Sequence, residues 1–327
     1  MFTQTKNNLH SVTMLRGIAS LGVCIAHFTG TVSSKLIQHA GNYGTWGVSL
    51  FFVISGFIIP YSLYYSNYKL KNYPYFILKR IIRLDPPYIL SILGIFLLSC
   101  LAQLSPYHTS NIINLFNANT LYHIFYVVDI LKGQWFNGAF WTLAIEFQFY
   151  ILIGLLFPLL TFKNNLIQLL LFLLFCSIPF FIPDNRFVTS YLLMFLPGIL
   201  LFFLMTKQIS LPIFIFSAII IVALNYIKTD IQGLICPIIA AGFILFIKKP
   251  IKPLIFLGTI SYSLYLINTP IGTDGIINFL QNYIISENGR IGLMIIALLI
   301  IIFFAWVFYR VIEKPSLKLS KKIVFRN

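Results

Sequence analysis

Long apolar stretches follow one another along the chain, separated by short polar segments. The most apolar of them, such as 166–181 and 292–308, contain no charged residue. A helix that is apolar on all sides fits lipid, and crossing the hydrocarbon core takes about 20 residues. The pattern predicts about ten membrane-spanning helices, at roughly 12–31, 46–66, 86–103, 141–160, 166–182, 188–206, 211–227, 231–247, 254–271 and 291–311.

The composition excludes an ordinary soluble domain. Hydrophobic residues make up 59% of the 327 residues and charged residues only 9%, against roughly 25% charged in soluble proteins. We therefore predict an all-α, polytopic transmembrane bundle that forms a single domain over 1–327, with no appended soluble domain. Four cysteines lie in apolar stretches without metal-site spacing, so we expect them to be inert packing residues: Cys24, Cys100, Cys176 and Cys236.

The net charge of +15 indicates how the helices are oriented. Cytoplasmic loops of membrane proteins are enriched in Lys and Arg. If the N-terminus is cytoplasmic, the predicted inner segments hold 18 of the 23 Lys and Arg residues and the outer segments hold 5. This asymmetry predicts an even number of crossings with both termini in the cytoplasm.

Arg16 and His27 are ionisable residues in the first predicted span, where each costs free energy and is a functional candidate. They are eleven residues apart, which is about three helical turns or 16 Å, so both side chains share one face. A neutral histidine is a suitable general base near pH 7. The alternative is that Arg16 is an ordinary interfacial residue and that His27 hydrogen-bonds a neighbour. The spacing leaves both interpretations open.

Glu146 is the only acidic residue well inside a predicted span. A carboxylate there is expected to be paired, protonated or in a wet cavity. Under the predicted topology His27 and Glu146 both fall in the outer halves of their helices. We therefore expect a pair between them, which could be catalytic or purely structural.

Arg80 and Arg83 are three residues apart and share a helix face. Two guanidiniums on one face suit phosphate groups, although anionic lipid or the topology rule would also explain them. The interleaved aromatics of a nucleic-acid surface are missing, so we expect no nucleic-acid partner. Ser55, followed by Gly56, indicates close helix packing rather than a nucleophile.

Taken in order, several stretches resemble the acyltransferase-3 family of membrane O-acyltransferases, which includes bacterial O-antigen acetyltransferases. They are Leu15-Arg16-Gly17-Ile18-Ala19 with His27 downstream, Phe51-Phe52-Val53-Ile54-Ser55-Gly56-Phe57-Ile58, Lys79-Arg80-Ile81-Ile82-Arg83-Leu84-Asp85-Pro86, Phe140-Trp141-Thr142-Leu143 through Glu146 to Phe149-Tyr150, Ile260-Ser261-Tyr262-Ser263-Leu264-Tyr265-Leu266, and Ile312-Glu313-Lys314-Pro315.

The resemblance implies an enzyme of a bacterial inner membrane that moves an acyl group, usually acetyl, from cytoplasmic acetyl-CoA to a hydroxyl of an envelope glycan, such as lipopolysaccharide, or of a lipid-linked sugar. No two histidines have metal-ligand spacing on a predicted helix, so we expect no metal. His27 and Glu146 become the catalytic pair. Arg16, Arg80 and Arg83 become the donor site, and five residues become substrate or structural support: Ser55, Trp141, Tyr150, Tyr265 and Asn268. Asn268 stands where family members often have histidine, so no acid–base role is expected there.

A rival class is a proton-coupled transporter or flippase of a glycan-related substrate, because intramembrane histidine and glutamate also mark proton-coupled transport. A third class is a structural scaffold of the membrane, which leaves His27 and Glu146 without a role. Consumption of acyl-CoA separates the enzyme from both other classes. The sequence does not identify the acceptor or the oligomeric state.

Overall fold

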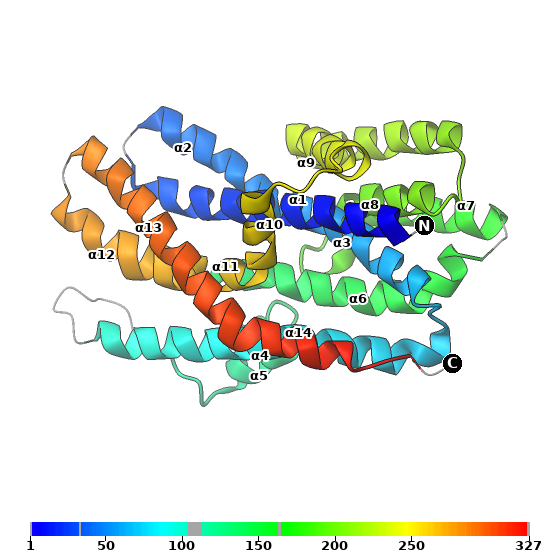
Figure 1. Cartoon of the computed structure of the whole chain (residues 1–327). Coiled ribbons are helices and arrows are strands. Elements are labelled where there is room, and N and C mark those ends of the chain that lie inside the picture. The colour runs from blue at the N-terminus through cyan, green and yellow to red at the C-terminus, as the bar shows by residue number, and fades with distance from the viewer. Residues whose placement is uncertain (1, 33, 104–112, 163–164, 285, 326–327) are drawn as a thin grey trace.

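The apolar stretches form helices, most of which lie lengthwise in one bundle (Figure 1). The computed structural model describes residues 2–32, 34–103, 113–162, 165–284 and 286–325, and no strand occurs among them. The α-helices are α1 Phe2–Phe28, α2 Lys35–Asn42, α3 Gly47–Tyr65, α4 Tyr73–Ala102, α5 Ala118–Ile124, α6 Trp141–Leu160, α7 Asn165–Phe181, α8 Leu192–Met205, α9 Leu211–Phe246, α10 Lys252–Thr259, α11 Ser261–Ile267, α12 Asn278–Leu280, α13 Glu287–Phe308 and α14 Lys314–Lys321.

Short helical turns of other types connect or extend these helices. Two segments, Asn268–Ile277 after α11 and Tyr309–Glu313 after α13, are π-helical. The 3₁₀ segments are Thr29–Thr31, Tyr43–Trp46, Leu70–Asn72, Gly138–Phe140, Val188–Tyr191 and Gln281–Tyr283. A π turn often marks a functional region of a helix, and the second π segment carries a buried glutamate described below.

The predicted all-α membrane bundle is confirmed. Within the described residues, seven helices are long and apolar enough to cross a membrane, or eight if α10 and the helix after it, bent by 56°, count as one. All ten predicted ranges coincide with helix, but the apolar part of α7 is short and α9 covers two ranges. The number of crossings therefore stays a prediction.

Helix α9 contains the break that the sequence predicts between 227 and 231. Thr229 and Asp230 have non-helical backbone angles, and Asp230 has a positive φ of 53°. In Figure 1 the first half of α9 lies lengthwise, whereas the second half is seen nearly end-on. The two halves therefore behave as separate helices.

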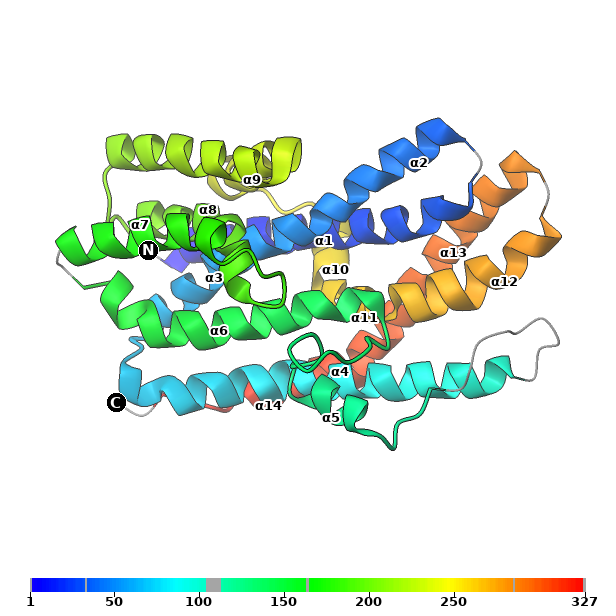
Figure 2. The ribbon, with the colours of Figure 1, turned by 180° about the vertical axis from the view of Figure 1, so that it is seen from behind.

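Figures 1 and 2 show where the ends of the chain lie. The start of α1 and the end of the described chain lie toward the same end of the bundle in both views. This arrangement agrees with termini on one side of the membrane. Which side that is stays a prediction.

Glycines let two helix pairs approach at backbone distance. A Cβ atom on Gly56 of α3 would lie 2.1 Å from the Phe195 carbonyl oxygen of α8, and one on Gly198 would lie 2.0 Å from the Val53 carbonyl oxygen. Gly17 of α1 is also close to α10, because a Cβ atom on it would lie 2.6 Å from the Leu254 carbonyl oxygen. The predicted packing notch at Gly56 is thus present.

Replacing Gly56 with valine is expected to destabilise the bundle, because the new side chain would meet the backbone of α8. Overpacking typically costs about 1–3 kcal/mol, and a backbone neighbour yields less than a side chain. Thermal unfolding in detergent should show a lower midpoint. Gly94→Val on α4 is the control, since a Cβ atom on Gly94 would have no neighbour within 4 Å. Equal midpoints for the two variants would contradict the close packing.

The interior consists of two hydrophobic clusters. One is built mainly from α1, α3, α6, α8 and α9, and the other from α1, α4, α6, α11 and α13. Helix α6 lies lengthwise near α4 in both views (Figures 1 and 2) and contributes to both clusters. Val48, Phe51 and Leu84 pack against both clusters and line the larger of the two cavities described below. This cavity therefore lies where the two clusters meet.

Candidate active site

The larger cavity, of about 950 Å³, gathers the charged residues that the sequence singled out. Arg16 comes from α1, Arg80 and Arg83 from α4, and Glu146 from α6. Ser55, Tyr150 and Tyr265 line the same cavity. Three guanidiniums therefore face one carboxylate, and we call this space the charged cavity.

None of these guanidiniums has a hydrogen bond or an ion pair within the described part of the chain, where the one ion pair joins Asp184 and Arg186. Arg80 is only 7% exposed, and its Nε atom is buried without a partner. Its guanidinium lies 5.1 Å from the ring centre of Phe76 and 5.2 Å from that of Tyr150, within cation–π range. A buried unsatisfied donor calls for a ligand or an ion.

A buried carboxylate beside this region belongs to Glu313, which is 4% exposed. It accepts hydrogen bonds from the Ser263 backbone N–H at 3.1 Å and from the Ser263 hydroxyl at 2.5 Å. Its charge acts on both Arg16 and Arg83 without forming a direct pair. Even with Glu313 counted, the arginines outnumber the carboxylates, so the region has a positive surplus that suits an anion.

Two hydroxyl groups donate hydrogen bonds to one carboxylate oxygen of Glu146. Its Oε1 atom accepts hydrogen bonds from Ser55 of α3, at 2.7 Å, and from Tyr150, one turn further along α6. Its Oε2 atom has no hydrogen-bond partner among the described residues. The expected His27–Glu146 pair is absent from this structure, because Glu146 lines the charged cavity and His27 lines a different cavity.

His27 lines a smaller cavity of about 320 Å³. The imidazole is exposed, and neither ring nitrogen has a hydrogen-bond partner among the described residues. Trp141 and Tyr191 also line this space, as does Gln232 of α9. No Lys, Arg, Asp or Glu does, so we call it the neutral cavity.

The two cavities share one wall, which we call the partition, formed by Val48, Phe52, Thr142 and Tyr265. The Thr142 and Tyr265 hydroxyls are 2.6 Å apart, and both lie within hydrogen-bond distance of the Ala139 carbonyl oxygen. A group that passes from one cavity to the other must cross between these side chains. The partition thus places His27 next to the charged cavity but outside it.

Asn268 contacts the backbone of Tyr265, one of the residues of the partition. It is fully buried and lines neither of these two cavities. Its amide group donates to the Tyr265 carbonyl oxygen at 3.0 Å, and its amide oxygen accepts a hydrogen bond from Thr269. Of the two roles left open for Asn268, substrate contact or structural support, this position favours structural support.

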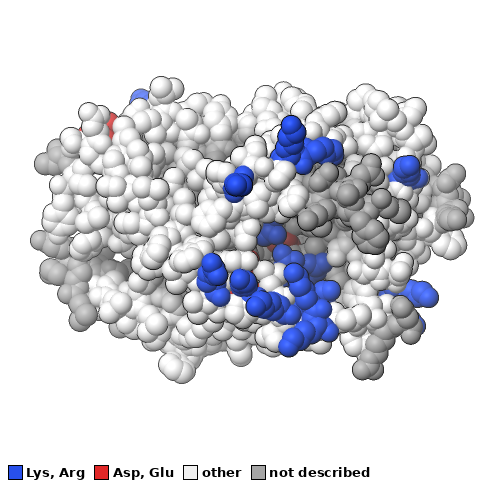
Figure 3. All heavy atoms as spheres, in the orientation of Figure 1, with Lys and Arg blue, Asp and Glu red and all other residues white. Residues whose placement is uncertain are grey.

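Basic side chains rim a hollow on one face of the molecule. Figure 3 shows Lys and Arg over α14 and around α10 and the segment before it, with the surface hollowed between the two groups. Basic and acidic side chains are visible in its depth. The lysines of these segments are Lys248, Lys249, Lys252, Lys314, Lys318 and Lys321.

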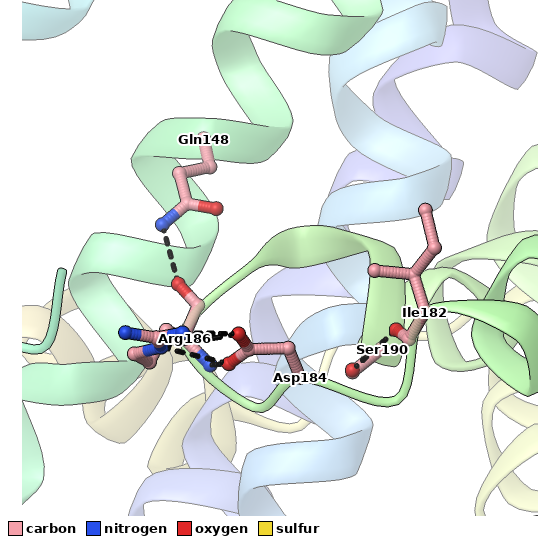
Figure 4. A network of polar contacts seen from close by, with 5 residues as sticks. All are labelled: Gln148, Ile182, Asp184, Arg186 and Ser190. Carbon is pink, nitrogen blue, oxygen red and sulfur yellow. Dashed lines mark hydrogen bonds and ion pairs between the residues drawn. The ribbon is translucent and has the colours of Figure 1, made fainter.

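A polar network fixes the loop that leads to Tyr191 (Figure 4). Gln148 of α6 donates to the Arg186 carbonyl oxygen at 3.0 Å and accepts from the Val188 backbone N–H at 2.8 Å. The Arg186 guanidinium bonds both oxygens of Asp184 and so holds the pKa of that carboxyl below its usual value. The loop between α7 and α8 is thereby tied to the helix that carries Glu146.

The cysteines and histidines show no metal-binding cluster within the described residues. Cys24, Cys176 and Cys236 are buried free thiols, which agrees with the packing role predicted for them. Cys100 is half-buried and also free.

Three residues described above were not singled out from the sequence. Gln232 is a polar residue within the predicted range 231–247, and a polar residue inside a predicted span could have identified it as a candidate. Tyr191 is one aromatic residue among many, so no signal distinguished it. Glu313 was noted only within a motif, because the last predicted span ends at 311, and its burial depends on the π-helical turn that contains it.

Comparisons with known proteins bear on the whole chain. Searches of curated proteins and of solved structures each return no match. The family model described as an acyltransferase domain matches residues 9–310, which include all ten of the site residues predicted from the sequence. With nearly the full length matched, the chain belongs to the acyltransferase-3 family.

Proposed function

We propose that this membrane acyltransferase transfers an acyl group, in the first instance acetyl, from acyl-CoA to a hydroxyl of an envelope glycan or lipid-linked sugar. One observation carries the proposal. Three unpaired guanidiniums line a cavity that shares a wall with a second cavity, where an unpaired imidazole is exposed. An anionic donor and a neutral acceptor can therefore occupy adjoining sites.

The donor half rests on charge. Coenzyme A carries several phosphate charges, and arginine binds phosphate through two parallel N–H bonds. Arg16, Arg80 and Arg83 supply such donors within the charged cavity, and the basic rim in Figure 3 attracts an anion toward the hollow. The free Oε2 of Glu146 accepts a hydrogen bond from an amide N–H of the pantetheine arm.

The transfer half rests on His27. The imidazole accepts the proton of the acceptor hydroxyl as its oxygen attacks the thioester carbonyl. A C–O bond forms, the C–S bond breaks, and the proton passes from His27 to the leaving thiolate. The thioester must reach the partition for this step. In a second form of the same reaction, His27 itself takes the acyl group and then passes it to the hydroxyl.

The direct test uses the purified protein in lipid nanodiscs with labelled acetyl-CoA. We expect release of CoA and transfer of label to added glycan or, more slowly, to water. Movement of a labelled glycan across sealed vesicles without consumption of acetyl-CoA would instead identify a transporter or flippase. Reporter fusions at both ends, in a bacterial inner membrane, test the predicted cytoplasmic termini.

A further inference from the structure

Several residues that line the neutral cavity have no role in the proposed reaction. Beyond His27, it contains two aromatic residues whose ring centres are 5.5 Å apart, Trp141 and Tyr191. The Trp141 indole N–H and the Tyr191 hydroxyl have no hydrogen-bond partner among the described residues. These side chains combine an apolar ring face with a free polar group, and such side chains suit ligands that are apolar on one side and wet on the other.

Gln232 adds a fixed acceptor to the same space. Its amide group donates to the Ser49 hydroxyl at 2.6 Å, and Ser49 in turn lies 3.5 Å from the Met194 sulfur. The amide oxygen of Gln232 keeps no partner in the described part of the chain. Because the opposite end of the amide is held, this oxygen is available to a ligand in a defined direction.

We infer that the neutral cavity is the acceptor subsite and holds one uncharged sugar ring, stacked against Trp141 and Tyr191. A ring hydroxyl donates to the Gln232 amide oxygen, and a second hydroxyl lies at His27. This inference rests on the proposed function and specifies its acceptor. The cavity of about 320 Å³ is at the small end of ligand sites, which run from about 300 to 1,000 Å³. It therefore suits a single ring rather than a chain of sugars.

The absence of a cation from the lining decides against an acidic sugar. No Lys or Arg lines the neutral cavity to offset a carboxylate or a phosphate, and burying an unpaired charge is costly. The charged groups of the substrates belong in the charged cavity instead. The partition thus separates the cavity for the charged donor from the cavity for the uncharged sugar.

Gly138 offers a way to fill the neutral cavity without disturbing the fold. It lines the cavity, nothing lies within 4 Å of a Cβ atom built on it, and its φ is not positive. In Gly138→Leu the new side chain takes up space that a ring would occupy. Gly94→Leu is the matched control, because its Cβ position is equally open and it lines neither of the two cavities.

The experiment measures acetyl transfer from acetyl-CoA to a panel of octyl glycosides: glucoside, galactoside, mannoside and N-acetylglucosaminide, with octanol and octyl glucuronide for comparison. We expect transfer to at least one neutral glycoside in preference to both comparison compounds. Gly138→Leu should raise the KM for that glycoside by on the order of tenfold or more, leaving the Kd for acetyl-CoA unchanged, while Gly94→Leu changes neither.

A second pair of variants tests the stacking. Tyr191→Leu removes the ring and should raise the glycoside KM by several-fold, up to about tenfold, whereas Tyr191→Phe keeps the ring and most of the affinity. Four results would each overturn the subsite. The first two are use of octanol as good as that of the glycosides, and a preference for the glucuronide. The other two are no transfer to any glycoside despite consumption of acetyl-CoA, and an unchanged glycoside KM in Gly138→Leu. Failure of the wild-type protein to bind or consume acetyl-CoA would instead overturn the proposed function.

Discussion

Replacing His27 with alanine is expected to lower the rate of acyl transfer by about 10²–10⁴-fold, the usual contribution of a general base. The imidazole is exposed in the neutral cavity and makes no hydrogen bond within the described chain, so its loss removes the proton acceptor without removing a structural contact. If His27 carries the acyl group itself, the loss is at least as large. The rate is measured as release of CoA and as label in the glycan.

The same variant should keep its fold and its donor site. Thermal unfolding of His27→Ala in detergent is expected to match that of the wild type, and the Kd for acetyl-CoA should change little, because Arg16, Arg80 and Arg83 line the other cavity. His39→Ala is the control histidine, since His39 is exposed on α2 and contacts Tyr43. Full activity in His27→Ala would refute the role of this imidazole in either form of the reaction.

The sequence singled out Arg16 and Glu146 because an ionisable residue inside a membrane is costly. It singled out Arg80 and Arg83 because two guanidiniums on one helix face suit phosphate groups. Arg16, the Arg80–Arg83 pair and Glu146 come from three different helices and line one cavity in the structure. Spacing along a helix also indicated correctly that Arg80 and Arg83 face the same way. These features depend on the geometry of single helices, which periodicity determines.

The His27–Glu146 pair could not be predicted correctly, because it depends on how two helices are rotated about their axes. Sequence position gave only the height of each residue in the membrane. Glu146 instead accepts hydrogen bonds from Ser55 and Tyr150, and the partition lies between the cavities that the two predicted catalytic residues line. Small hydroxyl residues are common in membrane helices, so nothing in the sequence marked these two as partners.

The small residues near Arg16 give a second example. Gly17 follows Arg16 directly, and the structure shows that its close neighbour is the backbone of α10. A glycine in a membrane helix indicates that something comes close, without indicating what. The identity of the neighbour follows from the packing of α1 against a helix that lies more than 230 residues further along the chain.

The second large effect is expected at Arg80. Its guanidinium lies within cation–π range of Phe76 and Tyr150 and has a buried Nε atom without a partner. Hydrogen bonds to charged groups contribute about 1.5–3 kcal/mol, so Arg80→Met should raise the KM for acetyl-CoA by about 10–150-fold. The KM of Arg80→Lys should lie between those of the wild type and Arg80→Met. Lysine keeps the positive charge but lacks the planar guanidinium, with its paired N–H donors and its contact with aromatic rings.

Lys79→Met provides the control for charge alone. Lys79 is the neighbouring residue of the same helix, does not line the charged cavity, and lies over the ring of Phe325 at 5.7 Å. Lys79→Met should change the KM for acetyl-CoA by less than Arg80→Lys does. If Lys79→Met raises the KM for acetyl-CoA as much as Arg80→Met does, the donor is bound by the positive potential of the whole face rather than by the guanidinium of Arg80.

A truncated donor identifies the group that Arg80 binds. S-Acetylpantetheine carries the same thioester as acetyl-CoA but no phosphate. If Arg80 binds a phosphate, the wild type and Arg80→Met should use S-acetylpantetheine with the same KM, and the difference between them should appear only with acetyl-CoA. An equal loss with both donors would place Arg80 beside the thioester instead. The carboxylate of Glu146 and the guanidinium would then act on the reacting end of the donor, with the phosphates held at the basic rim.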